Sequence, residues 1–209
     1  MRPLRSFMSA LALWAMFSPA AFAVDSAHGA YLPAKMAAPT PEGAEGLCRD
    51  YPWACAGKTS NAQLTPHALA KVEQVNKDAN AAIRPVTDKD QYGVQELWAL
   101  PGAGGGDCED YALFKKRALI HAGISPDRLL LTVVLDRRDD PHAVLVLRTD
   151  KGDYVLDNVT NRILAWHKTG YTFVAKQNPD NPSHWVAVFE KGAGPKLSAD
   201  AMLTGPLGR

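Results

Sequence analysis

The sequence has almost no net charge, and beyond its N-terminus it lacks any long apolar run. Its 209 residues include 23 lysines and arginines against 22 acidic residues. This balance gives no general electrostatic attraction to nucleic acid or to an anionic membrane. No later stretch approaches the roughly 18 consecutive apolar residues that span a bilayer. With 46% hydrophobic residues, the chain is typical of a folded globular protein, and we expect neither nucleic-acid binding nor membrane insertion.

The N-terminus has the pattern of a secretory signal peptide. Arg2 and Arg5 precede an apolar stretch over residues 7–17, and a small-x-small cleavage motif ends at Ala23. The apolar stretch is too short for a membrane anchor. We therefore expect residues 1–23 to be removed during export.

Composition divides the remainder into one domain with two flanks. Residues 24–46 are rich in Ala, Pro and Gly without periodicity, and residues 191–209 are rich in Gly, Pro and small side chains. Segments of this kind are typically poorly ordered. We predict a flexible lead-in over 24–46, a single folded domain over 47–190 and a loose C-terminal tail over 191–209.

Cysteine is scarce, and the three cysteines are not equivalent. Cys48 and Cys55 lie seven positions apart across a turn that contains Pro52. In an oxidising compartment we expect these two to form a disulfide. Cys108 is then left unpaired, and an odd thiol in an exported protein is a candidate reactive group.

Apolar periodicity and capping residues predict two helices. The first begins with Thr65 as N-cap and Pro66 at its first position, and it ends before Pro85. The second follows the glycine-rich loop over 101–106, with Asp107 as N-cap. Its predicted apolar face comprises Tyr111, Phe114, Ala118 and Ala122, with Lys115 and Lys116 pointing elsewhere, and Gly123 is its C-terminal cap.

Strands follow the second helix. Residues 129–135, 142–149 and 154–157 are apolar and rich in β-branched side chains, and the loops between them are short. This pattern predicts an antiparallel meander. Residues 171–174 and 185–189 are expected to add two strands. Two helices followed by a run of strands indicate the α+β class.

The start of the second helix has the chemistry of an activated nucleophile. Cys108 occupies its first position, directly after Gly104-Gly105-Gly106-Asp107. Free backbone N–H groups and the positive end of the helix dipole favour a thiolate there, and they can also stabilise an oxyanion. A phosphate-binding loop is excluded because no Lys-Ser/Thr pair follows the glycines.

A thiol nucleophile needs a base and a group that orients the base. His142 opens the second predicted strand, and Asp157 ends the third on the same face. A simple hairpin register places Asp157 opposite Val146, four residues from His142. In that register Asn161 faces His142, so Asn161 is the alternative third member.

Two sequence blocks carry a resemblance to a known family. They read GGGDCEDYALFKKRALIHAGI over 104–124 and DDPHAVLVLRTDKGDYVLDN over 139–158. From about Leu47 to Phe189 the chain resembles the bacterial transglutaminase-like cysteine peptidases, which include the LapG-type periplasmic proteases. The resemblance implies a papain/transglutaminase-like α+β fold, with the helix carrying the cysteine packed on an antiparallel sheet. It also implies a periplasmic cysteine endopeptidase with a triad of Cys108, His142 and Asp157.

The resemblance further implies a calcium ion held by acids beside the nucleophile. The matching residues are Asp107 and Glu109, together with Asp110. Three carboxylates would raise the pKa of the Cys108 thiol, and a hard cation bound by their oxygens would offset that effect. The alternative is that these acids only stabilise the helix dipole.

Partners are implied by the resemblance alone. The substrate would be a protein, such as a large surface adhesin whose cleavage releases a biofilm. Trp98 matches a surface tryptophan that contacts an inner-membrane receptor for cyclic di-GMP, although a tryptophan here could equally belong to the core. Two alternatives remain open at this stage: transglutaminase-like acyl transfer to an amine, and a non-catalytic module that binds calcium or a receptor.

Overall fold

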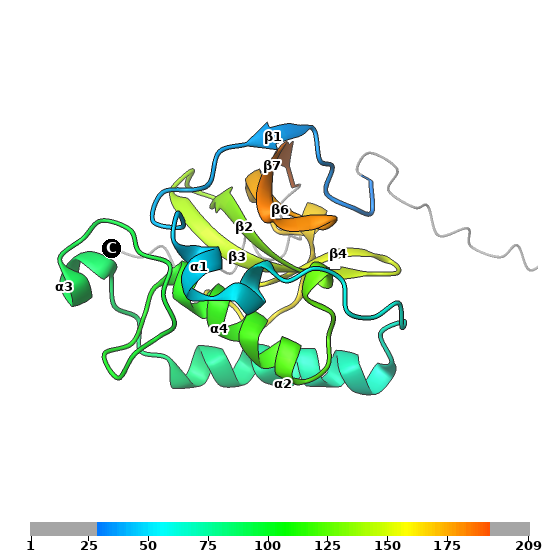
Figure 1. The fold of residues 1–209 in the computed structure, drawn as a ribbon, viewed down its shortest axis with the longest axis horizontal. Helices are drawn as coiled ribbons and strands as arrows, with labels where there is room; N and C mark the ends of the chain where they lie inside the picture. The colour runs from blue at the N-terminus through cyan, green and yellow to red at the C-terminus, as the bar shows by residue number, and fades with distance from the viewer. Residues whose placement is uncertain (1–28, 193–209) are drawn as a thin grey trace, which may run out of the picture.

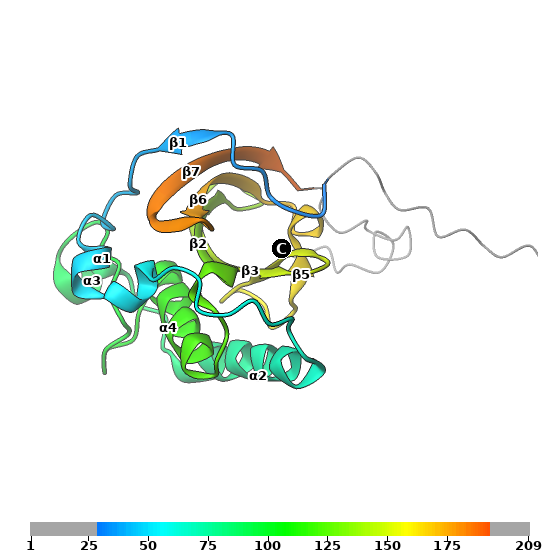
Figure 2. The same ribbon diagram turned by 45° about the vertical axis from the view of Figure 1, so that its right-hand side comes forward.

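A curled antiparallel sheet organises the protein in the computed structural model, which describes residues 29–192. The predicted signal peptide over 1–23 and nearly all of the predicted tail over 191–209 lie outside the described residues. The strand order is β1-β7-β6-β2-β3-β4-β5, and Figure 2 shows how the sheet bends around on itself. The strands are β1 (Met36–Ala38), β2 (Leu129–Leu135), β3 (Pro141–Thr149), β4 (Gly152–Leu156), β5 (Leu164–Ala165), β6 (Thr172–Asn178) and β7 (Asn181–Lys191).

The helices cover one face of the sheet. They are α1 (Leu47–Asp50), α2 (Pro66–Ala82), α3 (Asp88–Tyr92) and α4 (Cys108–His121), with short 3-10 turns at Pro52–Cys55, Pro126–Arg128 and Trp166–Lys168. Figure 1 shows α4 lying between the sheet and α2. Among the described residues, no helix is both long and apolar enough to cross a membrane.

Strand β2 is buried on both of its faces, which explains its unbroken apolar sequence. Leu129 and Leu131 belong to the core between the sheet and α4. Leu130 and Val134 belong to a second core inside the curl of the sheet. The predicted meander is confirmed, because β2 pairs with β3 and β3 pairs with β4, both antiparallel.

The predicted helix starts are confirmed. The Thr65 hydroxyl accepts a hydrogen bond from the backbone N–H of Ala68, and Pro66 is the first residue of α2. Helix α4 begins at Cys108, and Gly123 beyond its end has a φ of +90°. A glycine tolerates this left-handed backbone, which ends the helix without strain.

The predicted apolar face of α4 is wrong in part. Phe114 is 37% exposed, whereas Lys115 and Lys116 are 1% and 0% exposed. The reason is that α4 is covered by the sheet on one side and by α2 on another, so more than one stripe is buried. The long lysine side chains reach inward, and Lys116 donates to the Oε1 atom of Gln177 at 2.6 Å.

The lead-in predicted to be flexible over 24–46 is ordered where the structure describes it. Strand β1 pairs with β7, and Leu32 is 2% exposed. The backbone of Leu32 accepts from the Nζ of Lys176 and donates to a carboxylate oxygen of Asp153, both at 2.9 Å. Composition does not predict this ordered segment, because its backbone hydrogen-bond partners lie on the edge of β7, far away in the sequence.

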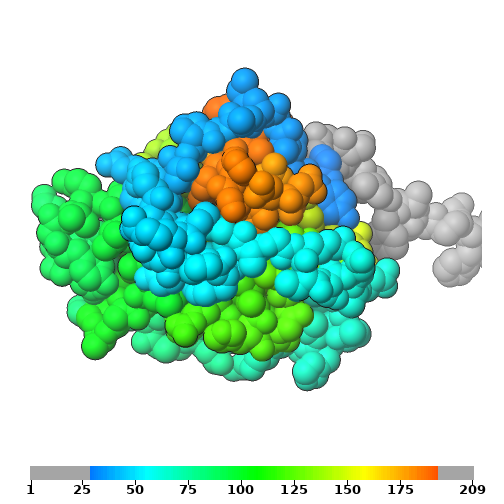
Figure 3. Space-filling model, viewed as in Figure 1, coloured from blue at the N-terminus to red at the C-terminus, as the bar shows by residue number. Residues whose placement is uncertain are grey.

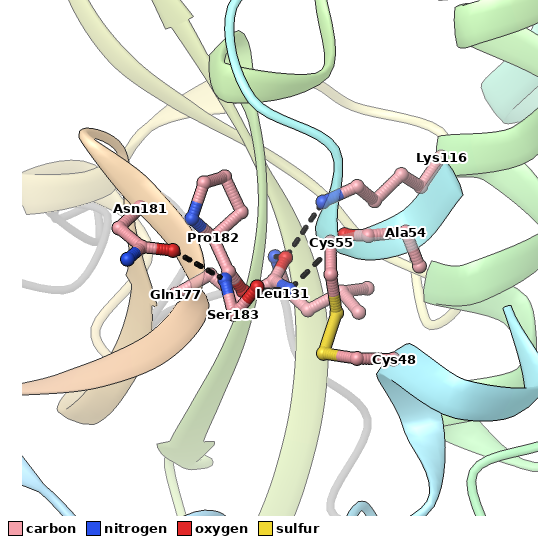
Figure 4. Close-up of a disulfide and its surroundings, with 9 residues drawn as sticks. All are labelled: Cys48, Ala54, Cys55, Lys116, Leu131, Gln177, Asn181, Pro182 and Ser183. Carbon is pink, nitrogen blue, oxygen red and sulfur yellow. Dashed lines mark hydrogen bonds between the residues drawn. A yellow bond between two sulfur atoms is a disulfide. The ribbon is translucent and has the colours of Figure 1, made fainter. Parts of the chain in front are cut away.

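The disulfide between Cys48 and Cys55 is present, as predicted. Beside it lies Gln177, whose side chain uses all its hydrogen-bonding capacity (Figure 4). Its oxygen accepts from Lys116 and from the N–H of Leu131, and its nitrogen donates to the carbonyls of Ala54 and Pro182. Gln177 thus bonds the turn at Pro52–Cys55 to β6. Figure 3 shows the segment from α1 to the start of α2, in cyan, between the orange β6–β7 hairpin and the green α4.

Candidate active site

Cys108 lies half-buried at the first position of α4, behind a loop that only glycine permits. Gly105 has a φ of +116°, and a Cβ built there would lie 2.0 Å from the carbonyl oxygen of Arg84. Next to it, the Gly106 N–H donates to that same carbonyl, and the Gly106 carbonyl accepts from Val86. The loop is thus bonded to the chain segment over 84–86, which fixes where the helix begins.

The Cys108 thiol lies between a backbone donor and a carboxylate. The Ala143 N–H donates to Sγ at 3.3 Å, and Sγ donates to Oε2 of Glu109 at 3.1 Å. Burial raises the pKa of the thiol, and the charges of Glu109 and then Asp107 raise it further, against the lowering effect of Ala143. While these carboxylates are uncompensated, the protonated thiol is strongly favoured.

His142 and Asp157 form a nearly buried pair. The Nε2 atom of His142 lies 3.0 Å from Oδ1 of Asp157, and the two side chains are 10% and 4% exposed. Burial works to raise the pKa of Asp157, but hydrogen bonds from His142 and Tyr171 hold it below its ordinary value. Asp157 is therefore held as an anion against the imidazole.

The simple hairpin register predicted between these strands is wrong. Thr149 pairs with Gly152 and Leu145 with Leu156, so the turn is formed by Asp150 and Lys151, one residue earlier than the predicted register requires. Asp157 consequently continues opposite Val144, two residues from His142 rather than four. The alternative residue Asn161 lies elsewhere, with its side-chain oxygen accepting from Asn80 at 2.9 Å.

Tyr171 completes this group, and sequence reasoning missed it. Its hydroxyl donates to Oδ2 of Asp157 at 2.6 Å. Its ring packs edge-on against His142, with the ring centroids 5.7 Å apart and the planes at 83°. Tyr171 stands just before β6, and no spacing relative to His142 or Asp157 marks it. Only the pairing of β6 with β2 brings it to the site.

Two cavities have Cys108 in their lining. Cys108 and His142 line one of them together with Trp98 and Val133. Cys108 also lines a second cavity, which Asn158 and the segment over 84–87 enclose with Asp107. Cys108 therefore lines two neighbouring cavities.

Three carboxylates gather beside the thiol. One oxygen from each of Asp88, Asp107 and Glu109 lies within 4.8 Å of the others. Asp88 is 2% exposed, and the Oδ1 of Asp107 and Oε1 of Glu109 are buried without a hydrogen-bond partner. Unpartnered buried carboxylate oxygens at this spacing suit a hard cation with oxygen ligands.

The cluster differs from the predicted ligand set in one residue, and Asp110 as a ligand stays a prediction because its Oδ2 is also buried without a hydrogen-bond partner. The Oδ1 of Asp110 accepts the N–H of Ala99 at 3.0 Å. Asp88 is the member that was not predicted, and it lies at the start of α3, a position that no local motif marks. Burial, and then the charge of Asp107, raise the pKa of Glu109 to about 9. Without a cation nearby, full ionisation of the three carboxylates is therefore unfavourable.

Trp98 belongs to the core, which is one of the two interpretations that the sequence left open. It is 5% exposed and packs edge-on against Trp185, with the ring centroids 5.6 Å apart. Its ring belongs to the core between the sheet and α4, and the N–H groups of Leu97 and Ala99 on either side of it donate to Asp88 and Asp110. A role for Trp98 in binding a partner remains a prediction.

Comparisons with known proteins give a family and a fold. A sequence model of the bacterial transglutaminase-like cysteine proteinases matches residues 34–193. A search of the curated proteins finds no match. Calcium-bound LapG of Legionella pneumophila is similar in fold, with 24% identity and a TM-score of 0.50 over 68% of this chain and 81% of LapG. EGTA-treated LapG of the same organism has 26% identity and a TM-score of 0.50 over 60% of this chain and 69% of its own.

Proposed function

Because the chain belongs to the bacterial transglutaminase-like cysteine proteinases, we propose that it is an exported, calcium-dependent endopeptidase with Cys108, His142 and Asp157 as its triad. The family match itself makes it a cysteine peptidase. The observation that carries the triad is the 3.0 Å contact between His142 and Asp157, together with the cavity that His142 and Cys108 both line.

The arrangement supports acyl transfer through sulfur. The Nε2 atom of His142 faces Asp157, which leaves Nδ1 to exchange a proton with the substrate and the thiol. Cys108 attacks the peptide carbonyl, and His142 takes the thiol proton and passes it to the leaving amine as the C–N bond breaks. Water then hydrolyses the thioester. Backbone N–H groups at the start of α4 stabilise the oxyanion in both steps.

The two cavities support cleavage within a chain rather than at its end. Cys108 lines both of them, so a substrate has room on either side of the bond under attack. An exopeptidase instead needs a wall or a charge that receives a chain terminus. The proposed substrate is accordingly an extended segment of a protein.

Asp88, Asp107 and Glu109 would hold the calcium ion. Their unpartnered buried oxygens fit a hard cation, and calcium-bound LapG of similar fold supports the assignment. The ion would supply positive charge that offsets the carboxylates beside the thiol. With Glu109 no longer the strongest acceptor near Sγ, the Cys108 proton is easier to pass to His142.

Location and partners follow from the signal sequence and the resemblance. The pattern over 1–23 and the Cys48–Cys55 disulfide support export to an oxidising compartment, which we take to be the periplasm. A surface adhesin as substrate, biofilm release as outcome and a cyclic di-GMP receptor as regulator are proposed on the family resemblance. The triad and the metal site do not depend on these partners.

Cleavage of an unfolded test protein, such as reduced casein, tests the proposal. With Ca²⁺ present, the exported chain should produce fragments, and Cys108→Ala and His142→Ala should produce none. His121→Ala is the matched control, because His121 is exposed at the end of α4 and should leave cleavage unchanged. Fragments formed at the original rate by Cys108→Ala would exclude the sulfur nucleophile.

A further inference from the structure

We propose that Tyr171 is a positioning residue that holds the carboxylate of Asp157 in the orientation His142 requires. The inference rests on the proposed triad and adds a residue to it. Tyr171 is 5% exposed and belongs to the core inside the curl of the sheet. Its hydroxyl donates to Oδ2 of Asp157 at 2.6 Å, and this is the oxygen that His142 does not contact.

The two carboxylate oxygens of Asp157 have separate partners. Oδ1 lies 3.0 Å from Nε2 of His142 and also accepts the N–H of Val159 at 3.1 Å. Oδ2 has the Tyr171 hydroxyl. The carboxylate therefore cannot rotate about its Cβ–Cγ bond without losing a charge-assisted hydrogen bond on one side or the other.

The ring of Tyr171 also sets where the imidazole lies. It meets His142 edge-on at 5.7 Å between the ring centroids, so one side chain contacts two of the three proposed triad members. Arg137 confines the tyrosine in turn. Its guanidinium carbon lies 5.7 Å from the Tyr171 ring centroid, and its Nε donates to the carbonyl of Thr169 at 2.9 Å. The hydroxyl is thereby aimed at Asp157.

The main chain of Asp157 is held by other residues, so the hydroxyl acts on the side chain alone. The Nδ2 of Asn80, on α2, donates to the Asp157 carbonyl at 2.9 Å. One turn earlier on the same helix, Asn76 donates to the carbonyl of Asn161 at 3.3 Å. Removing the Tyr171 hydroxyl should therefore free the carboxylate without releasing the loop that carries it.

Alkylation of Cys108 by iodoacetamide, followed by mass spectrometry, tests this inference without knowledge of the substrate. Cys48 and Cys55 are bonded to each other, so Cys108 is the free thiol. Rates are measured at neutral pH with saturating Ca²⁺ in the wild type, Tyr171→Phe, Asp157→Ala and the double variant. We expect Tyr171→Phe to react about tenfold more slowly, as loss of a hydrogen bond to a charged group implies. The double variant should react no more slowly than Asp157→Ala.

Tyr111→Phe is the matched control. The Tyr111 hydroxyl is also buried, but it donates to the carbonyl of Ile83 and not to Asp157. Tyr111→Phe should therefore change the alkylation rate by the same factor whether residue 157 is Asp or Ala. Thermal melting checks that every variant is folded, and Asp157→Asn replaces Asp157→Ala if the latter is not.

The four rates distinguish failure of the role given to Tyr171 from failure of the proposed triad. An unchanged rate for Tyr171→Phe, with Asp157→Ala slow, overturns the role of Tyr171 and leaves the triad intact. Equal slowing by Tyr171→Phe in both backgrounds shows a structural role and also overturns the inference. A wild-type rate for Asp157→Ala overturns the proposed triad and, with it, the role given to Tyr171.

Discussion

At the scale of single residues, the site is dominated by buried charge that lacks a partner. One oxygen of Glu109 accepts a hydrogen bond from the Cys108 thiol, while its other oxygen is buried without a hydrogen-bond partner. The two oxygens of Asp107 differ in the same way: one accepts the N–H of Asp88, and the other is buried without a hydrogen-bond partner. A carboxylate cluster next to a nucleophile suppresses the thiolate unless a cation compensates for it. This suppression is the physical reason for the calcium dependence that we propose.

Asp88 should be essential for calcium binding although it lies 20 positions before the nucleophile in the chain. Asp88→Asn should weaken Ca²⁺ binding about tenfold or more, because it removes a charged ligand. The rise in Tm on adding Ca²⁺, which follows from binding to the folded state alone, should shrink accordingly. Calorimetric titration and thermal melting measure both effects.

Asp90→Asn is the control for that prediction. Asp90 lies on the same short helix α3, is exposed, and bonds to Thr87 rather than to the cluster. It should bind Ca²⁺ within about twofold of the wild type, as expected for a surface charge. Equal Ca²⁺ affinity in Asp88→Asn and the wild type would contradict the assigned ligand set.

At the scale of elements, α4 carries both the nucleophile and two buried lysines. The Nζ of Lys116 bonds to Gln177, and the Nζ of Lys115 lies 5.8 Å from the ring centroid of Tyr111. Burial lowers the pKa of Lys116 to about 7. Burying the charged form of such a lysine costs free energy, so charged Lys116 destabilises the packing of α4.

Lys116→Met should therefore change how stability depends on pH. The unfolded chain, with an ordinary lysine pKa of 10.5, binds more protons than the folded chain between about pH 7 and that value. The contribution of Lys116 to the free energy of unfolding of the wild type therefore becomes more favourable as pH rises through this window. The Tm of Lys116→Met minus that of the wild type should be more positive at pH 6 than at pH 10.

An exposed lysine provides the comparison. Lys71 on α2 is exposed, and Lys71→Met should shift Tm by the same small amount at both pH values. A Tm difference for Lys116→Met that does not vary between pH 6 and pH 10 would mean that Lys116 keeps an ordinary pKa in the folded protein.

At the scale of the whole molecule, the first described residues complete the sheet. Strand β1 covers the edge of β7, and the carbonyl of Leu32 is the acceptor for the buried Nζ of Lys176. Removing this segment would expose an edge strand and leave a buried ammonium group without its partner. The N-terminal segment is therefore part of the folded domain.

A chain that begins at residue 40 should be measurably less stable than one that begins at residue 29. Loss of the Leu32 side chain and of its backbone bonds should lower the free energy of unfolding by about 3 kcal/mol. Urea denaturation measures this difference, and light scattering should show association through the uncovered edge of β7. Equal stability of the two chains would show that the lead-in contributes nothing to the fold.

Part of this protein could be predicted from local chemistry in the sequence. Thr65-Pro66 determines where α2 starts, because a hydroxyl cap and a proline suit those positions and few others. The glycines before Cys108 determine that a thiol stands at a helix start. The run over 129–135 is apolar at every position but one and became β2 with the predicted bounds. Each of these depends on residues a few positions apart.

The remaining features were decided only by tertiary structure. Asp157 meets His142 because the hairpin turns at Asp150 and Lys151, a register that apolar strands do not specify by themselves. Asp88 joins the acidic cluster, and Tyr171 bonds to Asp157, from elements distant in the chain. Trp98 is buried because Trp185 and α4 close over it. Local sequence encodes where helices and strands begin, but the contacts that make a site arise when separate elements pack, and packing depends on the whole chain.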